Sequence, residues 1–248
     1  MKLFGLIGKS LAHSYSQSLF AEKFEKEGLR DCQYRLFELS AIDLLPDLIA
    51  SEPDLCGFNV TIPYKKSVIP FLDELSPAAA EIGAVNVVKV EQRGGDQCLK
   101  GYNTDAEGFA SSLSGVELPN KALVLGTGGA ASAVSYVLRK RGIPFLQVSR
   151  APGQGDMTYA DVTEKVLRDH PLVINCTPAG TTGEKQRLLP LPYEALTPAH
   201  YLYDLVYNPE LTPFLEKGKN CGARTQNGLS MLHLQAEAAW RIWGSSEE

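Results

Sequence analysis

The chain has 248 residues, of which 44% are hydrophobic and 21% are charged, and its formal net charge is −5. This is the composition of an ordinary globular protein of one or two domains, so disordered and fibrous classes are excluded. The acidic balance argues against a nucleic-acid partner, because a phosphate backbone needs a broad cationic surface. The five cysteines and four histidines are too dispersed for a disulfide framework or a zinc site, so no metal is expected.

The sequence contains no apolar stretch that approaches the ~20 residues of a membrane span. Lys9 also interrupts the N-terminal apolar run before it reaches the length of a signal sequence. We therefore expect no membrane partner and a cytoplasmic location.

The first half of the chain alternates short apolar runs, typical of buried strands, with stretches of helical period. This alternation predicts an α/β fold. The predicted strands are 3–8, 33–37, 55–62 and 84–90, and the predicted helices are 17–27, 41–50 and 64–75.

A second alternating series starts at Asn120, after the turn-rich stretch 114–120, which we interpret as a domain boundary. The last segment places Trp240 and Trp243 on the apolar stripe of an amphipathic helix, and periodicity does not decide which domain this helix packs on. The predicted strands of the second series are 122–125, 145–148, 172–175 and 201–206, with helices beginning near Gly129, Tyr159 and Thr212.

A glycine-rich turn joins a predicted strand to a predicted helix in the second half. Gly126, Gly128 and Ala131 match the spacing G-x-G-x-x-G/A. Gly126 can take the tight turn, and Gly128 leaves room for the backbone to approach a pyrophosphate at the helix N-terminus. The pattern favours a dinucleotide site over a simple glycine turn.

The end of the next strand indicates which dinucleotide would bind. An acidic residue about 20 positions after the glycines would hold the ribose of NAD, but this chain has Ser149 and Arg150 there. An arginine suits the 2′-phosphate of NADP, because it donates bidentate charge-assisted hydrogen bonds. NADP is therefore the expected cofactor, and a merely exposed basic residue is the alternative.

Three polar clusters follow predicted strands in the first half, where open α/β sheets build their sites. Taken singly, each has a structural explanation: a helix cap, a turn before a proline or a surface lysine. The clusters are His13-Ser14-Tyr15-Ser16, the segment 59–65, and Asn86 followed by Asn103-Thr104-Asp105.

Together with the glycine turn, and in this order, the clusters resemble the shikimate dehydrogenase family over nearly the whole chain. The shared motifs are Ser14-Tyr-Ser16, Asn59-Val-Thr61-x-Pro63-x-Lys65, Gly83-Ala-Val-Asn86, Asn103-Thr104-Asp105-x-x-Gly108, Gly126-x-Gly128-Gly129-Ala130, Asn175-x-Thr177-Pro178-x-Gly180, Asp204-x-x-Tyr207 and Gly228-Leu-x-Met231-Leu232-x-x-Gln235.

The resemblance implies reversible NADPH-dependent reduction of a small molecule, 3-dehydroshikimate, to shikimate, a step of aromatic amino-acid biosynthesis. It also implies two α/β domains. One is an N-terminal substrate domain of residues 1–102 plus 226–248, onto which the last helix folds back. The other is a doubly wound Rossmann-type NADP-binding domain of residues 103–225. A monomer and a homodimer both stay open.

The resemblance further implies a role for individual residues. Lys65 and Asp105 are the expected catalytic pair, with Lys65 beside the reacting oxygen, and which of the two carries the proton stays open. The expected substrate-binding residues are Ser14 and Ser16 for the carboxylate, and Thr61, Asn86 and Gln235 for ring hydroxyls. The expected cofactor-binding residues are Gly126, Gly128, Gly129, Ala130, Ser149, Arg150, Thr177, Tyr207 and Gly228.

Two departures from the family pattern bear on these expectations. Gln17 stands where the family usually has proline, and Arg150 is a single cation where the family commonly has a second basic residue nearby.

A quinate/shikimate or aminoshikimate dehydrogenase, with NAD or NADP, is therefore an open alternative. A non-catalytic NADP-sensing protein is another, although it would need neither Lys65 nor Asp105. A methyltransferase is disfavoured, because no acid follows the second strand to hold a ribose.

Overall fold

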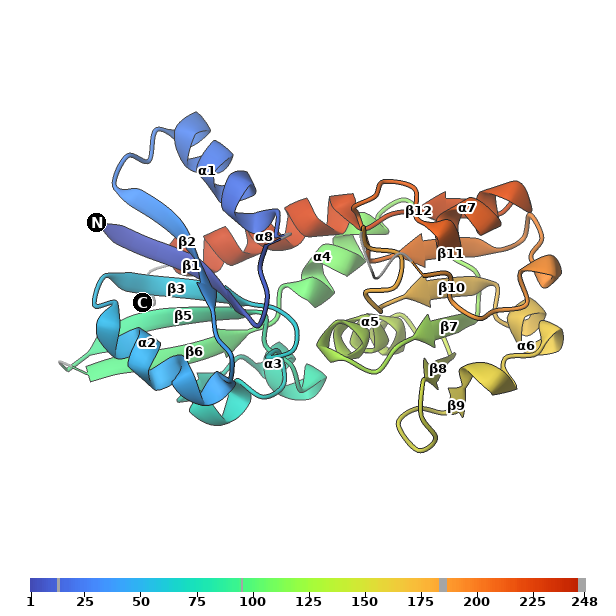
Figure 1. The fold of residues 1–248 in the computed structure, drawn as a ribbon, viewed down its shortest axis with the longest axis horizontal. Helices are drawn as coiled ribbons and strands as arrows, with labels where there is room; N and C mark the ends of the chain where they lie inside the picture. Colours follow the sequence, from blue (N-terminus) through green and yellow to red (C-terminus); the bar gives the residue numbers. More distant parts are fainter. Residues whose placement is uncertain (13, 95, 183–186, 245–248) are drawn as a thin grey trace. The chain divides into compact units, whose positions relative to one another are not determined.

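A computed structural model of the chain describes residues 1–12, 14–94, 96–182 and 187–244 (Figure 1). The chain divides into two compact units. Unit 1 comprises Met1–Thr104 together with the C-terminal segment from Ala236, and unit 2 comprises Asp105–Gln235. The chain returns from unit 2 to unit 1 between Gln235 and Ala236, inside the last helix. The boundary predicted from the sequence lies earlier, at 225/226.

Unit 1 is built on a mixed sheet with the strand order β2-β1-β3-β5-β6-β4. β1 pairs in parallel with β2 and β3, whereas β5 pairs antiparallel with β3 and β6. The strands are β1 (Lys2–Gly8), β2 (Cys32–Glu38), β3 (Leu55–Val60), β4 (Glu74–Leu75), β5 (Val87–Arg93) and β6 (Asp96–Tyr102). The helices are α1 (Ser16–Glu27), α2 (Leu45–Ser51) and α3 (Pro77–Ile82), with 3-10 turns η1 (Ile42–Leu44) and η2 (Ile69–Phe71).

Both faces of this sheet are covered, which explains the continuous apolar run of β1. Leu3 and Ile7 pack in one buried cluster with residues of α2. Phe4 instead packs in a second cluster with α1 and with the C-terminal part of α8 (Leu229–Gly244). Alternate side chains of one strand therefore enter two separate cores.

The second core of unit 1 is aromatic, and it shows where the last helix packs. The ring of Trp243 stacks on Phe4 with centroids 4.9 Å apart, and its indole N–H donates to the carbonyl of Val88 at 3.0 Å. Gly57 allows this approach, because a Cβ there would overlap the indole. The tryptophan end of α8 thus belongs to unit 1, which periodicity left undecided.

Unit 2 contains a sheet in which every pair of neighbouring strands is parallel, with the order β12-β11-β10-β7-β8-β9. Counted within the unit this is the order 6-5-4-1-2-3 of a Rossmann fold, so the predicted two-domain α/β class is confirmed. The strands are β7 (Ala122–Leu125), β8 (Phe145–Ser149), β9 (Met157–Thr158), β10 (Leu172–Asn175), β11 (Tyr201–Asp204) and β12 (Arg224–Gln226). The helices are α4 (Asp105–Ser112), α5 (Gly129–Lys140), α6 (Glu164–Asp169) and α7 (Pro213–Asn220), with 3-10 turns η3 (Tyr159–Asp161) and η4 (Tyr193–Ala195).

The predicted helix over 64–75 is wrong. This segment forms turns, the short η2 and the strand β4. Pro70 lies in its interior, where a proline removes a helical hydrogen bond and clashes with the preceding turn. The predicted strand 55–62 ends early at Val60, and the strand predicted from 84 begins at Val87. The strands β6, β9 and β12 were not predicted.

No helix among the described residues combines the length and the apolar character needed to cross a membrane.

Candidate active site

The carboxyl ends of β1 and β3 place the segment 61–65 at one edge of the sheet of unit 1. The backbone N–H of Thr61 donates to the carbonyl of Ile7 at 2.9 Å. A Cβ at Gly8 would lie 2.7 Å from the methyl group of Thr61, so the two strand ends meet only because Gly8 has no side chain. Thr61 itself is half-buried.

Backbone hydrogen bonds hold the same segment against the residues that precede β5. The carbonyl of Lys65 accepts from Val85 N–H at 2.7 Å, and the carbonyl of Asn86 accepts from Val60 N–H at 2.9 Å. Lys65 is half-buried. The structure therefore brings three of the predicted residues, Thr61, Lys65 and Asn86, into one neighbourhood of unit 1.

Asn86 is a buried amide whose side chain contacts Thr104. Its Oδ1 accepts from the Thr104 N–H at 2.6 Å, and its Nδ2 donates to the Thr104 hydroxyl at 2.9 Å. Asn86 and Thr104 are only 3% and 1% exposed. Because Asp105 follows directly as the buried first residue of α4, Asn86 fixes the chain just before the predicted catalytic carboxylate.

The two predicted carboxylate-binding serines lie at the start of α1, and both are half-buried. The hydroxyl of Ser14 accepts from the N–H of Ser16 at 3.3 Å, so Ser14 also supports entry into the helix. The residue before the helix, Tyr15, makes no side-chain capping bond. Hydroxyl contacts to a substrate stay a prediction for both serines.

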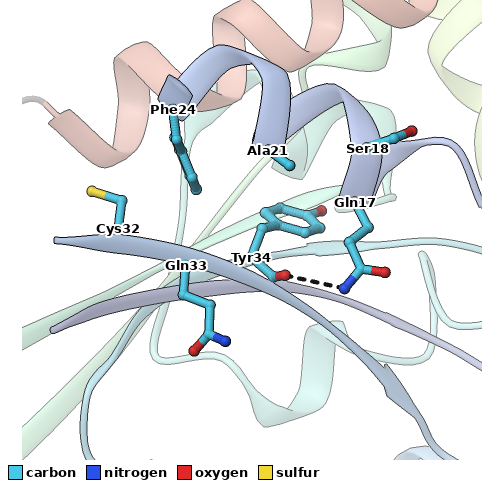
Figure 2. A pocket seen from close by; sticks show the side chains of 7 residues that line it. All are labelled: Gln17, Ser18, Ala21, Phe24, Cys32, Gln33 and Tyr34. Atoms are coloured by element: carbon cyan, nitrogen blue, oxygen red, sulfur yellow. Dashed lines mark hydrogen bonds between the residues drawn. The ribbon is translucent and has the colours of Figure 1, made fainter. Parts of the chain in front are cut away.

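Gln17, where the family usually has proline, ties the first turn of α1 to the edge strand β2. Its side-chain amide donates to the carbonyl of Tyr34 at 3.4 Å beside a surface pocket (Figure 2). Tyr34 is buried, and its hydroxyl donates to Asn59 Oδ1 at 2.7 Å, while burial raises its pKa well above the usual value. The pocket is lined by Gln17, Ser18, Ala21, Phe24, Cys32, Gln33 and Tyr34, none of which is a predicted site residue.

In unit 2 the predicted cofactor residues follow the carboxyl ends of neighbouring parallel strands. Gly126 follows β7 with φ +114°, a conformation that favours glycine. A Cβ at Gly126 would lie 3.0 Å from the methyl group of Thr177, which follows β10. The N–H of Gly126 donates to Val148 at 2.8 Å, immediately before Ser149. Gly126, Ser149 and Thr177 therefore meet at the point where the strand order reverses, the usual nucleotide position of this fold.

Gly128 provides a test of whether a dinucleotide fits here. It precedes α5 with φ −77° and ψ −176°, which other residues adopt equally well. A Cβ there would meet no protein atom within 4 Å. Neither backbone strain nor packing requires this glycine, and the open space beside it leaves room for a phosphate to approach the N-terminus of α5. Gly129 and Ala130 form the first turn of that helix, so the turn fits a dinucleotide.

The residues that would distinguish NADP from NAD end β8. Ser149 is 3% exposed, and its hydroxyl donates to the carbonyl of Ala151 at 2.5 Å. Arg150 is exposed. Ser149 therefore shapes the turn, while Arg150 presents its guanidinium outside the core.

Gly228 has a packing role that the sequence did not reveal. Its N–H donates to the carbonyl of Val206 at 3.2 Å, and a Cβ at this position would overlap the carbonyl of Leu205. The glycine thus allows the start of α8 to approach the segment after β11, which contains the half-buried Tyr207. Cofactor contacts of Gly228 and Tyr207 stay predictions.

Gln235, the last residue of unit 2, lies where α8 approaches α4. Its side-chain amide donates to the carbonyl of Leu232 at 3.0 Å. A Cβ at Gly108 would lie 2.9 Å from the Cβ of Gln235, so Gly108 permits the close approach of the two helices.

Sequence reasoning gave no role to a buried polar network in the same unit. Its members are Asn175, Asp204 and Thr212, all of them 0% exposed. The only signal in the sequence was the presence of two of them in shared motifs. Among the described residues, no three His, Cys, Asp or Glu side chains are grouped so that they could hold a metal ion.

Comparisons with known proteins identify the family. The family profile of the shikimate dehydrogenase substrate binding domain matches residues 6–88. The shikimate dehydrogenase (NADP(+)) of Chlorobaculum tepidum is 37% identical over 99% of this chain and 91% of its own length. The chain belongs to the shikimate dehydrogenase family. A solved family member, the shikimate 5-dehydrogenase of Thermus thermophilus in complex with NADP(H) and shikimate, is 34% identical, with a TM-score of 0.85 over 98% of this chain and 94% of its own.

The quinate dehydrogenase of Corynebacterium glutamicum in complex with NAD has a similar fold but a more distant sequence. It is 25% identical, with a TM-score of 0.84 over 99% of this chain and 94% of its own. Fold alone therefore does not separate shikimate from quinate dehydrogenases, whereas sequence identity favours the shikimate dehydrogenase family.

Proposed function

We propose that this chain catalyses the reversible NADPH-dependent reduction of 3-dehydroshikimate to shikimate. The observation that carries the proposal is a dinucleotide turn whose Gly128 is required neither by packing nor by backbone strain, in a chain that belongs to the shikimate dehydrogenase family. Thr61, Lys65 and Asn86, which backbone hydrogen bonds bring into one neighbourhood of unit 1, also support the proposal. Their polar side chains suit a hydroxylated substrate.

In this proposal, NADPH supplies the hydride when it is bound. Lys65 donates a hydrogen bond to the substrate oxygen that gains negative charge, and it delivers the proton to that oxygen. In the reverse direction the neutral amine of Lys65 accepts the hydroxyl proton. Asp105 orients a ring hydroxyl and acts as the partner of Lys65.

The remaining roles concern binding. Ser14 and Ser16 hold the substrate carboxylate, and Thr61, Asn86 and Gln235 contact the ring hydroxyls. Arg150 reads the 2′-phosphate of the cofactor with its exposed guanidinium. The backbone after β7, from Gly126 to Ala130, holds the pyrophosphate. Ser149, Thr177, Tyr207 and Gly228 complete the cofactor site. Light scattering would decide between a monomer and a homodimer.

Four absorbance assays test the proposal: shikimate and quinate, each with NADP and with NAD. We expect the highest kcat/KM for shikimate with NADP, and little or no turnover of quinate. Faster turnover of quinate with NAD would identify a quinate dehydrogenase instead. Binding of NADPH without turnover of either substrate would identify a non-catalytic sensor.

A further inference from the structure

Asp204 is a buried carboxylate at the end of β11 for which the proposed chemistry has no use. It is 0% exposed and accepts three hydrogen bonds from described residues. Oδ1 accepts from Asn175 Nδ2 at 2.8 Å and from the N–H of Val206 at 3.0 Å, and Oδ2 accepts from the hydroxyl of Thr212 at 2.6 Å. The two oxygens therefore serve different parts of unit 2.

The contact with Asn175 extends to a predicted cofactor residue. The Oδ1 of Asn175 accepts from both the N–H and the hydroxyl of Thr177, at 2.9 and 2.7 Å. Its Nδ2 also donates to the carbonyl of Ala179 at 3.1 Å. Since Asn175 is 0% exposed, the loop after β10 is held from inside by an amide whose orientation Asp204 fixes.

The contact with Val206 extends to a second predicted cofactor residue. Val206 precedes Tyr207, so the hydrogen bond to Oδ1 fixes the turn that carries the Tyr207 side chain. Gly180 brings the loop after β10 onto the same carboxylate: its φ is +99°, and a Cβ there would lie 3.2 Å from the Cβ of Thr212. Asp204 is thus bonded to the turn before Tyr207 directly and to the loop after β10 through Asn175.

We propose that Asp204 is a positioning residue for the cofactor: through Oδ1 it holds the Thr177 loop and the Tyr207 turn in the arrangement that binds NADP(H). This inference rests on the proposed function. The Oδ2 oxygen has a separate role, because the Thr212 hydroxyl that donates to it also accepts from Leu215 N–H at 3.3 Å and caps α7.

The separation of the two oxygens gives a matched pair of variants. Asp204→Ala removes the acceptor for Asn175, Val206 and Thr212. Thr212→Val removes the bond to Oδ2 and the cap of α7 but preserves the shape of the side chain and both bonds to Oδ1. The dissociation constant for NADPH alone is measured by fluorescence titration, and KM for 3-dehydroshikimate is measured at saturating NADPH. Thermal unfolding reports the stability of each variant.

We expect Asp204→Ala to raise the dissociation constant for NADPH about tenfold or more, with a smaller change in KM for 3-dehydroshikimate. Thr212→Val should lower the unfolding midpoint but leave NADPH affinity within about threefold of wild type. Equal losses of affinity in both variants, or unchanged affinity in Asp204→Ala, would overturn the inference.

A second variant keeps the test decisive if Asp204→Ala does not fold. Asn175→Ala breaks the link between Asp204 and Thr177, and it should also weaken NADPH binding about tenfold. An unchanged affinity would overturn the inference. Wild-type protein that binds NADPH but turns over neither shikimate nor quinate would refute the proposed function alone. Wild-type protein that binds no NADPH would refute both.

Discussion

Asn86 and Thr104 are joined by two hydrogen bonds, one to the backbone N–H of Thr104 and one to its hydroxyl. These bonds connect the residue before β5 to the residue before α4, 18 positions apart in the chain. Since Thr104 precedes Asp105, a side chain assigned to substrate binding also fixes the backbone next to the predicted catalytic carboxylate.

Asn86→Ala is therefore expected to lower both stability and activity. A buried N–H of Thr104 loses its acceptor, which should reduce the free energy of unfolding by about 1–3 kcal/mol. We expect kcat/KM for shikimate to fall at least about tenfold, measured beside urea unfolding. Asn103→Ala, which removes a buried hydrogen bond to the carbonyl of Ala84 at 2.8 Å, is the matched control. Equal losses of kcat/KM in both variants would show that Asn86 has no special role.

Lys65→Ala should lower kcat at least about 100-fold, with a smaller effect on KM, because it removes the proposed proton donor. The neighbouring Lys66 is exposed and provides the control, since Lys66→Ala removes a charge of the same kind one position away. Steady-state kinetics on both folded variants make the comparison. Near-normal turnover of Lys65→Ala would remove Lys65 from the mechanism.

Arg150→Ala should raise KM for NADPH much more than KM for NADH, because only NADPH carries the 2′-phosphate. Arg168 is an exposed arginine of α6 that pairs with Glu164 at 2.9 Å, and Arg168→Ala should change neither constant. Proportional changes of both constants in Arg150→Ala would show that Arg150 does not read the phosphate.

Gly128→Ala should separate folding from cofactor binding. Its backbone conformation suits alanine and its Cβ would meet no protein atom, so the free energy of unfolding should change by less than about 1 kcal/mol. Affinity for NADPH should nevertheless fall about tenfold or more, because the methyl group would stand where the pyrophosphate approaches. Gly57→Ala should behave in the opposite way and destabilise unit 1, where a Cβ would overlap Trp243. Full NADPH affinity in Gly128→Ala would contradict the assigned pyrophosphate site.

The pH dependence of stability tests the burial of Asp204. Burial raises the pKa of this carboxyl from 3.8 to about 6 in the folded chain. Between these values the unfolded state ionises while the folded state stays protonated, so the wild type loses stability as the pH rises, by about 3 kcal/mol in all. Asp204→Asn does not titrate and should lack this loss.

Urea unfolding of the wild type and of Asp204→Asn from about pH 4 to pH 7 measures the difference in their loss of stability. Asp161 provides a control whose stability contribution changes with pH in the opposite direction, because hydrogen bonds from Thr158 lower the pKa of its carboxyl. Asp161 should therefore contribute stability that is lost as the pH falls. Parallel curves for the wild type and Asp204→Asn would show that Asp204 is not buried as described.

Features that local chemistry dictates could be predicted from the amino-acid sequence alone. The fully buried strand β7 is a continuous apolar run, β10 is an apolar run that ends in Asn175, and their predicted bounds agree with the structure. The glycine turn was visible because its spacing joins a strand to a helix within a few residues. Thr212 was likewise visible as the start of a helix, which it caps.

Features that depend on distant residues were decided only by the tertiary structure. Periodicity placed Trp243 on an apolar stripe, but Phe4 and Gly57 decided which unit receives it. The sequence placed Asp204 in a motif without a role, because its burial arises from neighbours that approach only after β10 and β11 pair. Local patterns encode strands and turns over a few residues, whereas burial and hydrogen-bond partners are set by segments that meet only when the chain folds.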